Sequence, residues 1–80
     1  MDDHRYRLGA TIRDGRLARD LTQEELGDLI GVTQVTVSGW ESGKQIPKLP
    51  ALGDLAKRLK LDAGKLYALA GEAAREPIPA

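Results

Sequence analysis

The sequence predicts an all-α protein, a compact bundle of five short helices. Apolar residues recur three and four positions apart along most of the 80-residue chain, which is the spacing of one helix face. Residues typical of helix ends, including Thr22, Gly31 and Gly43, separate these stretches. A chain of this length forms one domain with a modest core.

The first two helices are expected over residues 7–19 and 22–30. Leu8 and Ile12 lie four positions apart in the first helix, and Gly15 within it costs about 1 kcal/mol relative to alanine. Thr22, followed three residues later by Glu25, forms the pattern of a capping box. This pattern predicts where the second helix begins.

The third helix is expected over residues 33–42, capped by Thr33 and ended by Gly43. Residues 32–38 (VTQVTVS) conflict with this interpretation, because they alternate and are rich in β-branched side chains, as in a strand. We interpret the segment as helical because capping residues flank it and no second segment could pair with it.

Two further helices complete the bundle. Pro50 suits the first turn of the fourth helix, and Asp62 is placed to cap the fifth. The apolar stripes of these helices consist of Leu52, Leu55, Ala56 and Leu59 and of Leu66, Leu69 and Ala70. We therefore place the folded domain at residues 5–70 and a flexible C-terminal tail at residues 71–80.

The composition argues against several classes of function. The chain has no cysteine and a single histidine, His4, so neither disulfides nor a metal site is expected. No apolar run approaches the roughly 18 residues of a membrane span, and the N-terminus lacks the pattern of a secretory signal. No nucleophile–base pair or phosphate-binding loop is apparent. We expect a cytoplasmic protein that is not an enzyme and needs no cofactor.

Charge is distributed unevenly, although 12 basic and 12 acidic residues give a net charge of zero. The charged residues of segment 20–28 are all acidic, and we expect this cluster to face water. In segments 5–19 and 42–60 most of the charged residues are basic, which predicts a basic face. The neutral total still predicts weak non-specific affinity for DNA. Lys57, Arg58, Lys60 and Lys65 are expected only to be solvated.

A helix-turn-helix is predicted at about residues 22–42. Only Gly31 and Val32 join the second helix to the third, so the two must cross sharply, and Gly27 is the small residue that the crossing needs. In this geometry the third helix can enter the major groove of DNA. We expect the buried side of the helix pair to hold Leu26, Ile30, Val32, Val37 and Trp40, and the exposed side of the third helix to hold Gln34, Val35, Thr36, Ser38 and Gly39. Val35 could instead pack in the core if the helix were rotated.

The motif consists of QEELG at residues 23–27, GVTQ at 31–34 and VSGWESGK at 37–44. This pattern resembles the phage-repressor, Cro and Xre (lambda-repressor-like) helix-turn-helix family, and the resemblance covers about residues 5–70. It implies a lambda-repressor-like DNA-binding domain of bacterial or phage origin that acts as a transcriptional repressor. One such domain contacts few base pairs, so we expect a homodimer on a pseudo-palindromic operator.

The resemblance also implies a role for each matching residue. Gln34 would be the main base reader, through a bidentate contact with adenine. Arg16 would pair with Glu41 and brace the motif. Base contacts are expected from Gln34, Val35, Thr36 and Ser38; phosphate contacts from Thr22, Gln23, Thr33, Ser42, Lys44 and Lys48; and structural support from Arg16, Leu26, Gly27, Gly31, Val37, Trp40 and Glu41.

Three residues depart from the family pattern. Gly39 stands where a long polar or basic reader is usual, and Gly15 replaces a larger residue in the first helix. Lys60 replaces the customary glycine after the fourth helix and is expected to strain that turn. The third helix has no Lys or Arg, which suggests either modest affinity for DNA or reliance on DNA shape and a dimer partner.

The sequence leaves the dimer surface and one alternative function open. The dimer surface is expected among apolar residues of the C-terminal part, namely Leu61, Leu66, Tyr67, Leu69 and Ile78. The alternative is a protein-interaction module, for example an antitoxin-like protein, that keeps the fold with weak DNA affinity and binds a toxin or another regulator. The zero net charge, Gly39 and the lack of a basic residue in the third helix favour this alternative.

Overall fold

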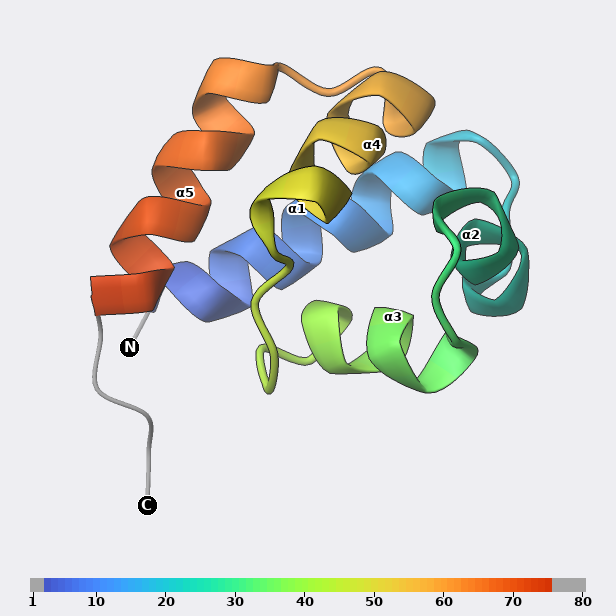
Figure 1. Cartoon of the computed structure of the whole chain (residues 1–80), viewed down its shortest axis with the longest axis horizontal. Coiled ribbons are helices and arrows are strands. Elements are labelled where there is room, and N and C mark those ends of the chain that lie inside the picture. Colours follow the sequence, from blue (N-terminus) through green and yellow to red (C-terminus); the bar gives the residue numbers. More distant parts are fainter. Residues whose placement is uncertain (1–2, 76–80) are drawn as a thin grey trace.

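Five helices follow one another along residues 3–75, the part of the chain that the computed structural model describes. They are α1 (His4–Ala18), α2 (Gln23–Ile30), α3 (Gln34–Glu41), α4 (Leu49–Leu59) and α5 (Ala63–Arg75), and no strand occurs within that range. α1 crosses the middle of the molecule in contact with α3, α4 and α5, while α2 contacts α3 and α4 (Figure 1). The predicted all-α fold is therefore confirmed.

α1 begins at His4, three residues before the position predicted from sequence. Asp3 caps it, because its Oδ1 accepts a hydrogen bond from the backbone N–H of Tyr6 at 2.6 Å. The helix also passes very close to the end of α3. A Cβ at Gly9 would lie 2.5 Å from the carbonyl oxygen of Glu41 and 2.6 Å from that of Trp40. Only a glycine permits this approach.

The helix-turn-helix forms where the sequence predicts it. Thr22 and Glu25 make both hydrogen bonds of the capping box, at 3.0 and 2.9 Å. Gly31 ends α2 in the left-handed conformation at φ +87°, and the backbone N–H groups of Gly31 and Val32 both donate to the carbonyl of Gly27. A Cβ at Gly27 would lie 2.6 Å from the carbonyl oxygen of Val32, so the crossing does require glycine there.

The region 32–38, which alternates like a strand, is helical from Gln34 onward. Thr33 Oγ1 accepts a hydrogen bond from the backbone N–H of Thr36 at 3.2 Å and so starts α3. Val37 and Trp40 point into the core, where Trp40 is 4% exposed. Trp40 is thus a packing residue, as expected.

The last two helices close the core from the other side. Leu52, Leu55, Leu59 and Leu66 are buried and form one cluster with Leu8, Ile12 and Leu26. Lys60 ends α4 in the left-handed conformation at φ +55°, where a side chain is unfavourable. The strain expected at this turn is therefore present. Asp62 Oδ1 accepts from the backbone N–H of Lys65 at 2.9 Å and caps α5.

The boundary predicted for the flexible tail is wrong for residues 71–75. α5 continues through them to Arg75, because Ala73 is fully buried within the bundle and α5 packs along α1. The remaining residues of the predicted tail, 76–80, lie outside the described part of the chain. Within the described part, no helix is long and apolar enough to cross a membrane.

Candidate nucleic-acid interface

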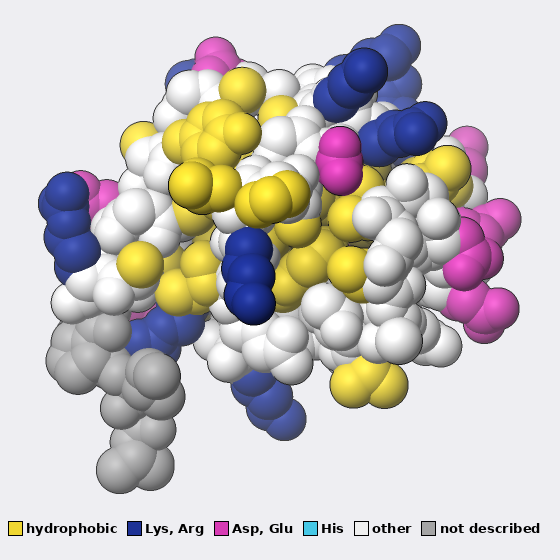
Figure 2. All heavy atoms as spheres, viewed as in Figure 1, with side chains coloured by type: hydrophobic (Ala, Val, Ile, Leu, Met, Phe, Trp, Pro, Cys, Tyr) yellow, Lys and Arg dark blue, Asp and Glu magenta, His cyan; other side chains and the backbone are white. Residues whose placement is uncertain are grey.

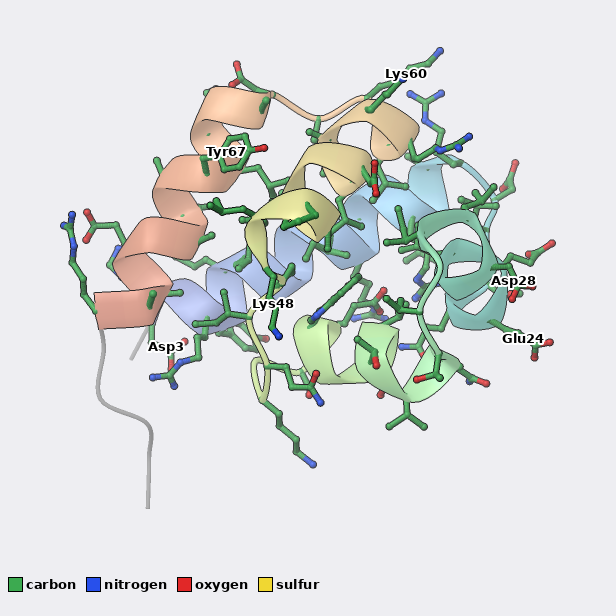
Figure 3. The ribbon with its side chains drawn as sticks, viewed as in Figure 1. Asp3, Glu24, Asp28, Lys48, Lys60 and Tyr67 are labelled. Carbon is green, nitrogen blue, oxygen red and sulfur yellow. The ribbon has the colours of Figure 1, made fainter. Side chains whose placement is uncertain are left out.

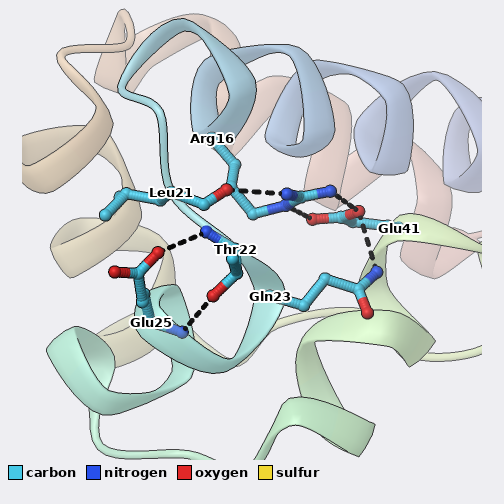
Figure 4. Close-up of polar contacts among 6 residues, drawn as sticks. All are labelled: Arg16, Leu21, Thr22, Gln23, Glu25 and Glu41. Carbon is cyan, nitrogen blue, oxygen red and sulfur yellow. Dashed lines mark hydrogen bonds and ion pairs between the residues drawn. The ribbon is translucent and has the colours of Figure 1, made fainter.

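The interface is built on a buried polar network that joins α1, α2 and α3 (Figure 4). The Arg16 guanidinium donates to both carboxylate oxygens of Glu41, at 2.7 and 3.0 Å, and to the carbonyl of Leu21 at 2.8 Å. Gln23 Nε2 donates to Glu41 Oε1 at 3.1 Å. The start of α2 and the end of α3 are thereby tied to one carboxylate.

The Arg16–Glu41 pair has the bidentate geometry of strong ion pairs. Its side chains are 10% and 5% exposed. The hydrogen bond to Glu41 raises the pKa of Arg16 above its ordinary value, although burial acts in the opposite direction. Arg16 therefore stays charged in the fold, and its hydrogen bonds to Glu41 join α1 to the end of α3.

Gln23 has a part in this network in addition to its expected place at a phosphate. Its side chain is half-buried, and one N–H of its amide is used by Glu41. The second N–H and the carbonyl oxygen of the amide are left for another partner. Sequence reasoning missed this bridge, because the family resemblance that implies the Arg16–Glu41 pair assigns Gln23 to a phosphate instead.

The outer face of α3 presents an exposed row of short and polar side chains. Gln34, Val35 and Ser38 are exposed, and Val35 is 75% exposed, which excludes a place in the core. Thr36 is half-buried, and its hydroxyl lies 3.1 Å from that of Thr33. Three of the four expected base-contacting residues therefore share an open surface, and Thr36 lies at its margin.

Gly39 was expected on the exposed side of α3, and this expectation is wrong. The residue is buried, and a Cβ there would lie 3.0 to 3.2 Å from side-chain atoms of Gln45. The loop after α3 folds back over Gly39, which the sequence pattern of the helix alone does not reveal.

The expected phosphate-contacting residues lie around both ends of α3. Thr22 and Thr33 occupy the caps of α2 and α3, and Ser42 Oγ donates to the carbonyl of Gly39 at 3.2 Å. Lys44 and Lys48 are exposed in the segment that follows α3. Two lysines thus supply positive charge on this side of the motif.

Acidic side chains gather elsewhere. Figure 3 shows Glu24 and Asp28 pointing outward from α2, and Figure 2 shows a group of acidic side chains on the α2 side of this view, with others scattered over the surface. Both residues are exposed, as expected for the cluster at residues 20–28.

The expected dimer surface is only partly exposed. Leu66 is 1% exposed and belongs to the core, so its assignment to that surface is wrong. Leu61 and Leu69 are half-buried against the core, whereas Tyr67 is exposed. Ile78 lies outside the described residues.

The motif model of a helix-turn-helix family, HTH_3, matches residues 12–66. The chain belongs to this family. The resemblance to the phage-repressor and Xre type of helix-turn-helix that the sequence indicates is thereby confirmed.

Two relatives and one solved structure are similar to this helix-turn-helix chain. The cryptic phage CTXphi transcriptional repressor RstR of Vibrio cholerae is 50% identical over 50 residues, which are 62% of this chain and 45% of RstR. The ImmF control region 10 kDa protein of Bacillus phage phi105 is 32% identical over 60 residues, 75% of this chain and 67% of that protein. This chain therefore spans less than half the length of RstR.

The structural match supports the fold. The clp gene regulator ClgR from Corynebacterium glutamicum superposes with a TM-score of 0.74 and 24% identity, over 91% of this chain and 79% of that one. At this identity the match establishes the helical architecture alone.

Within the described residues, no cluster of three or more potential metal ligands occurs.

Proposed function

We propose that this protein is a sequence-specific transcriptional regulator, a repressor, that inserts α3 into the major groove of duplex DNA. The observation that carries the proposal is the outer face of α3, where Val35 is 75% exposed between polar side chains at the end of a rigidly braced helix. An aliphatic side chain in such a place suits the methyl group of thymine, and Gln34 beside it suits adenine. The repressor RstR is the relative that favours repression.

Phosphate contacts would fix the docking of α3. Thr22, Gln23 and Thr33 lie at the N-termini of α2 and α3, where backbone N–H groups favour an anion. Lys44 and Lys48 would neutralise phosphates beyond α3, and Ser42 would contact the sugar–phosphate backbone of the DNA near them. These contacts position the protein without reading sequence.

We further propose that the regulator acts as a homodimer in a bacterial cytoplasm. A shallow apolar groove runs between the start of α4 and α5, with Leu49 and Tyr67 exposed at its rim. Figure 2 shows hydrophobic side chains gathered over α4 and α5. Two copies joined there would bind half-sites about one helical turn, roughly 34–36 Å, apart.

The test is a selection of binding sites from random duplex DNA, followed by affinity measurements across a salt series. We expect a pseudo-palindromic preference and a linear fall of log affinity with log salt. Gln34→Ala should relax the preference at one base pair of each half-site. Lys44→Ala should weaken all sequences alike and reduce the salt slope by about one.

A second candidate is an antitoxin-like interaction module with weak DNA affinity. It is favoured by the net charge of zero and by an α3 without Lys or Arg. Such a module would give no selected site in the same experiment and no effect of Gln34→Ala. A toxin or another regulator would then be its partner.

A further inference from the structure

The outer row of side chains on α3 lacks a member at Gly39, next to the loop that follows the helix. Residue 39 lies four positions after Val35, so a side chain there would continue the row that Val35 begins. Gly39 has no side chain and is nevertheless buried. Something else covers this part of the helix.

The covering group is the side chain of Gln45. A Cβ at Gly39 would lie 3.0 Å from Gln45 Cδ, 3.1 Å from its Nε2 and 3.2 Å from its Cγ. The side-chain amide of Gln45 therefore occupies the space that a larger residue at position 39 would fill.

The backbone holds Gln45 in this place. The N–H groups of Lys44 and Gln45 donate to the carbonyl of Gly39 at 2.9 and 3.1 Å, and Ser42 Oγ donates to the same oxygen at 3.2 Å. Gly43 supplies the turn, at φ +80°. One carbonyl on α3 thus fixes the loop against the helix.

The Gln45 amide is free to bind. Gln45 is exposed, and its amide has no hydrogen bond to any residue in the described range 3–75. It borders a shallow groove together with Thr36 and Lys48. A glutamine amide carries a donor and an acceptor side by side, which is the pattern that the major-groove edge of adenine matches.

We infer that Gln45 is a specificity-determining residue that reads a base, with adenine preferred, in place of the side chain that Gly39 lacks. The inference rests on the proposed function, because it requires α3 to lie in the major groove. It assigns to the loop a contact that the departure at Gly39 would otherwise remove.

The test compares four variants of the full chain on the selected operator and on all its single-base-pair substitutions. Gln45→Ala should lower the discrimination at one base pair per half-site by roughly tenfold. Gly39→Ala should have the same effect at the same base pair, because its Cβ displaces the Gln45 side chain. In the double variant the two effects should not add.

Gln34→Ala is the matched control, since it should alter a different base pair. The circular dichroism spectrum of each variant is compared with that of the unaltered protein, as a check that the variant folds. The inference is overturned if Gln45→Ala leaves every preference within twofold while Gln34→Ala changes one. It is equally overturned if Gln45→Ala weakens all sequences alike, as a phosphate contact would. If the unaltered protein selects no site, the proposed function fails, and this inference with it.

Discussion

The α1–α3 part and the α4–α5 part of the molecule hold their helices in different ways. α1, α2 and α3 each begin at a side-chain cap, from Asp3, Thr22 and Thr33, and the buried Arg16–Glu41 pair ties them together. In the α4–α5 part, Asp62 caps α5. By contrast, α4 follows Lys48, whose side chain makes no cap, and is ended by a strained Lys60. It is held mainly by buried leucines. Directional bonds thus hold α3 in place, whereas non-directional packing holds α4.

The largest expected effect lies in the apolar part. Leu55 is fully buried, so Leu55→Ala should lower the free energy of unfolding by about 2–5 kcal/mol, measured by urea denaturation. Leu49 on the same helix is 69% exposed, and Leu49→Ala should change it by less than about 0.5 kcal/mol. Equal losses in both variants would contradict the place assigned to α4 in the core.

A smaller effect is expected from the polar network. Arg16→Lys keeps the charge but loses the bidentate geometry, and should cost about 1–3 kcal/mol of unfolding free energy. The control is Arg75→Lys, which alters a pair with Glu72 whose arginine side chain is 79% exposed. That variant should cost less than about 0.5 kcal/mol. If both cost the same, the buried network would not brace the motif.

The pH dependence of this network has a definite sign. The pKa of Arg16 is raised in the fold, so its contribution to stability is complete below the ordinary pKa of an arginine and is lost only as the pH rises through the higher folded value. The stability difference between the unaltered protein and Arg16→Lys should therefore stay constant from about pH 7 to 9, where lysine is also charged. Urea titrations at several pH values check this, and a steady fall over that range would contradict it.

The smallest effect should be a gain. Lys60→Gly removes a side chain from a left-handed position and should raise the unfolding free energy by about 0.5–1 kcal/mol. Lys57→Gly, three residues earlier within α4, should instead lower it by about 1 kcal/mol, because glycine is unfavourable inside a helix. Thermal unfolding of both variants measures the contrast. A loss in both would mean that the turn is not strained.

Local signals made the α1–α3 part predictable from sequence. The caps at Thr22 and Thr33 and the turn at Gly31 depend on neighbours within four residues, and the structure places them as expected. The wrong expectations depend on tertiary packing. Gly39 is covered by Gln45 from the next loop, and the end of α5 is held by the burial of Ala73.

The same distinction applies to the exposed face of α3. The exposure of Gln34 and Ser38 follows from helix periodicity, whereas the exposure of Val35 is decided by the rotation of α3, which Trp40 and Val37 fix in the core. Sequence could not choose between the two places for Val35. The bridge from Gln23 to Glu41 was hidden for a similar reason.

The close approach at Gly9 has a consequence for the nucleic acid. In the proposed docking, the close packing of the Glu41 and Trp40 carbonyls over Gly9 of α1 restricts how far α3 can tilt to follow an imperfect groove. Any mismatch in curvature has to be absorbed by bending or twisting of the duplex. We therefore expect flexible pyrimidine–purine steps to be enriched at operator positions that no side chain reaches.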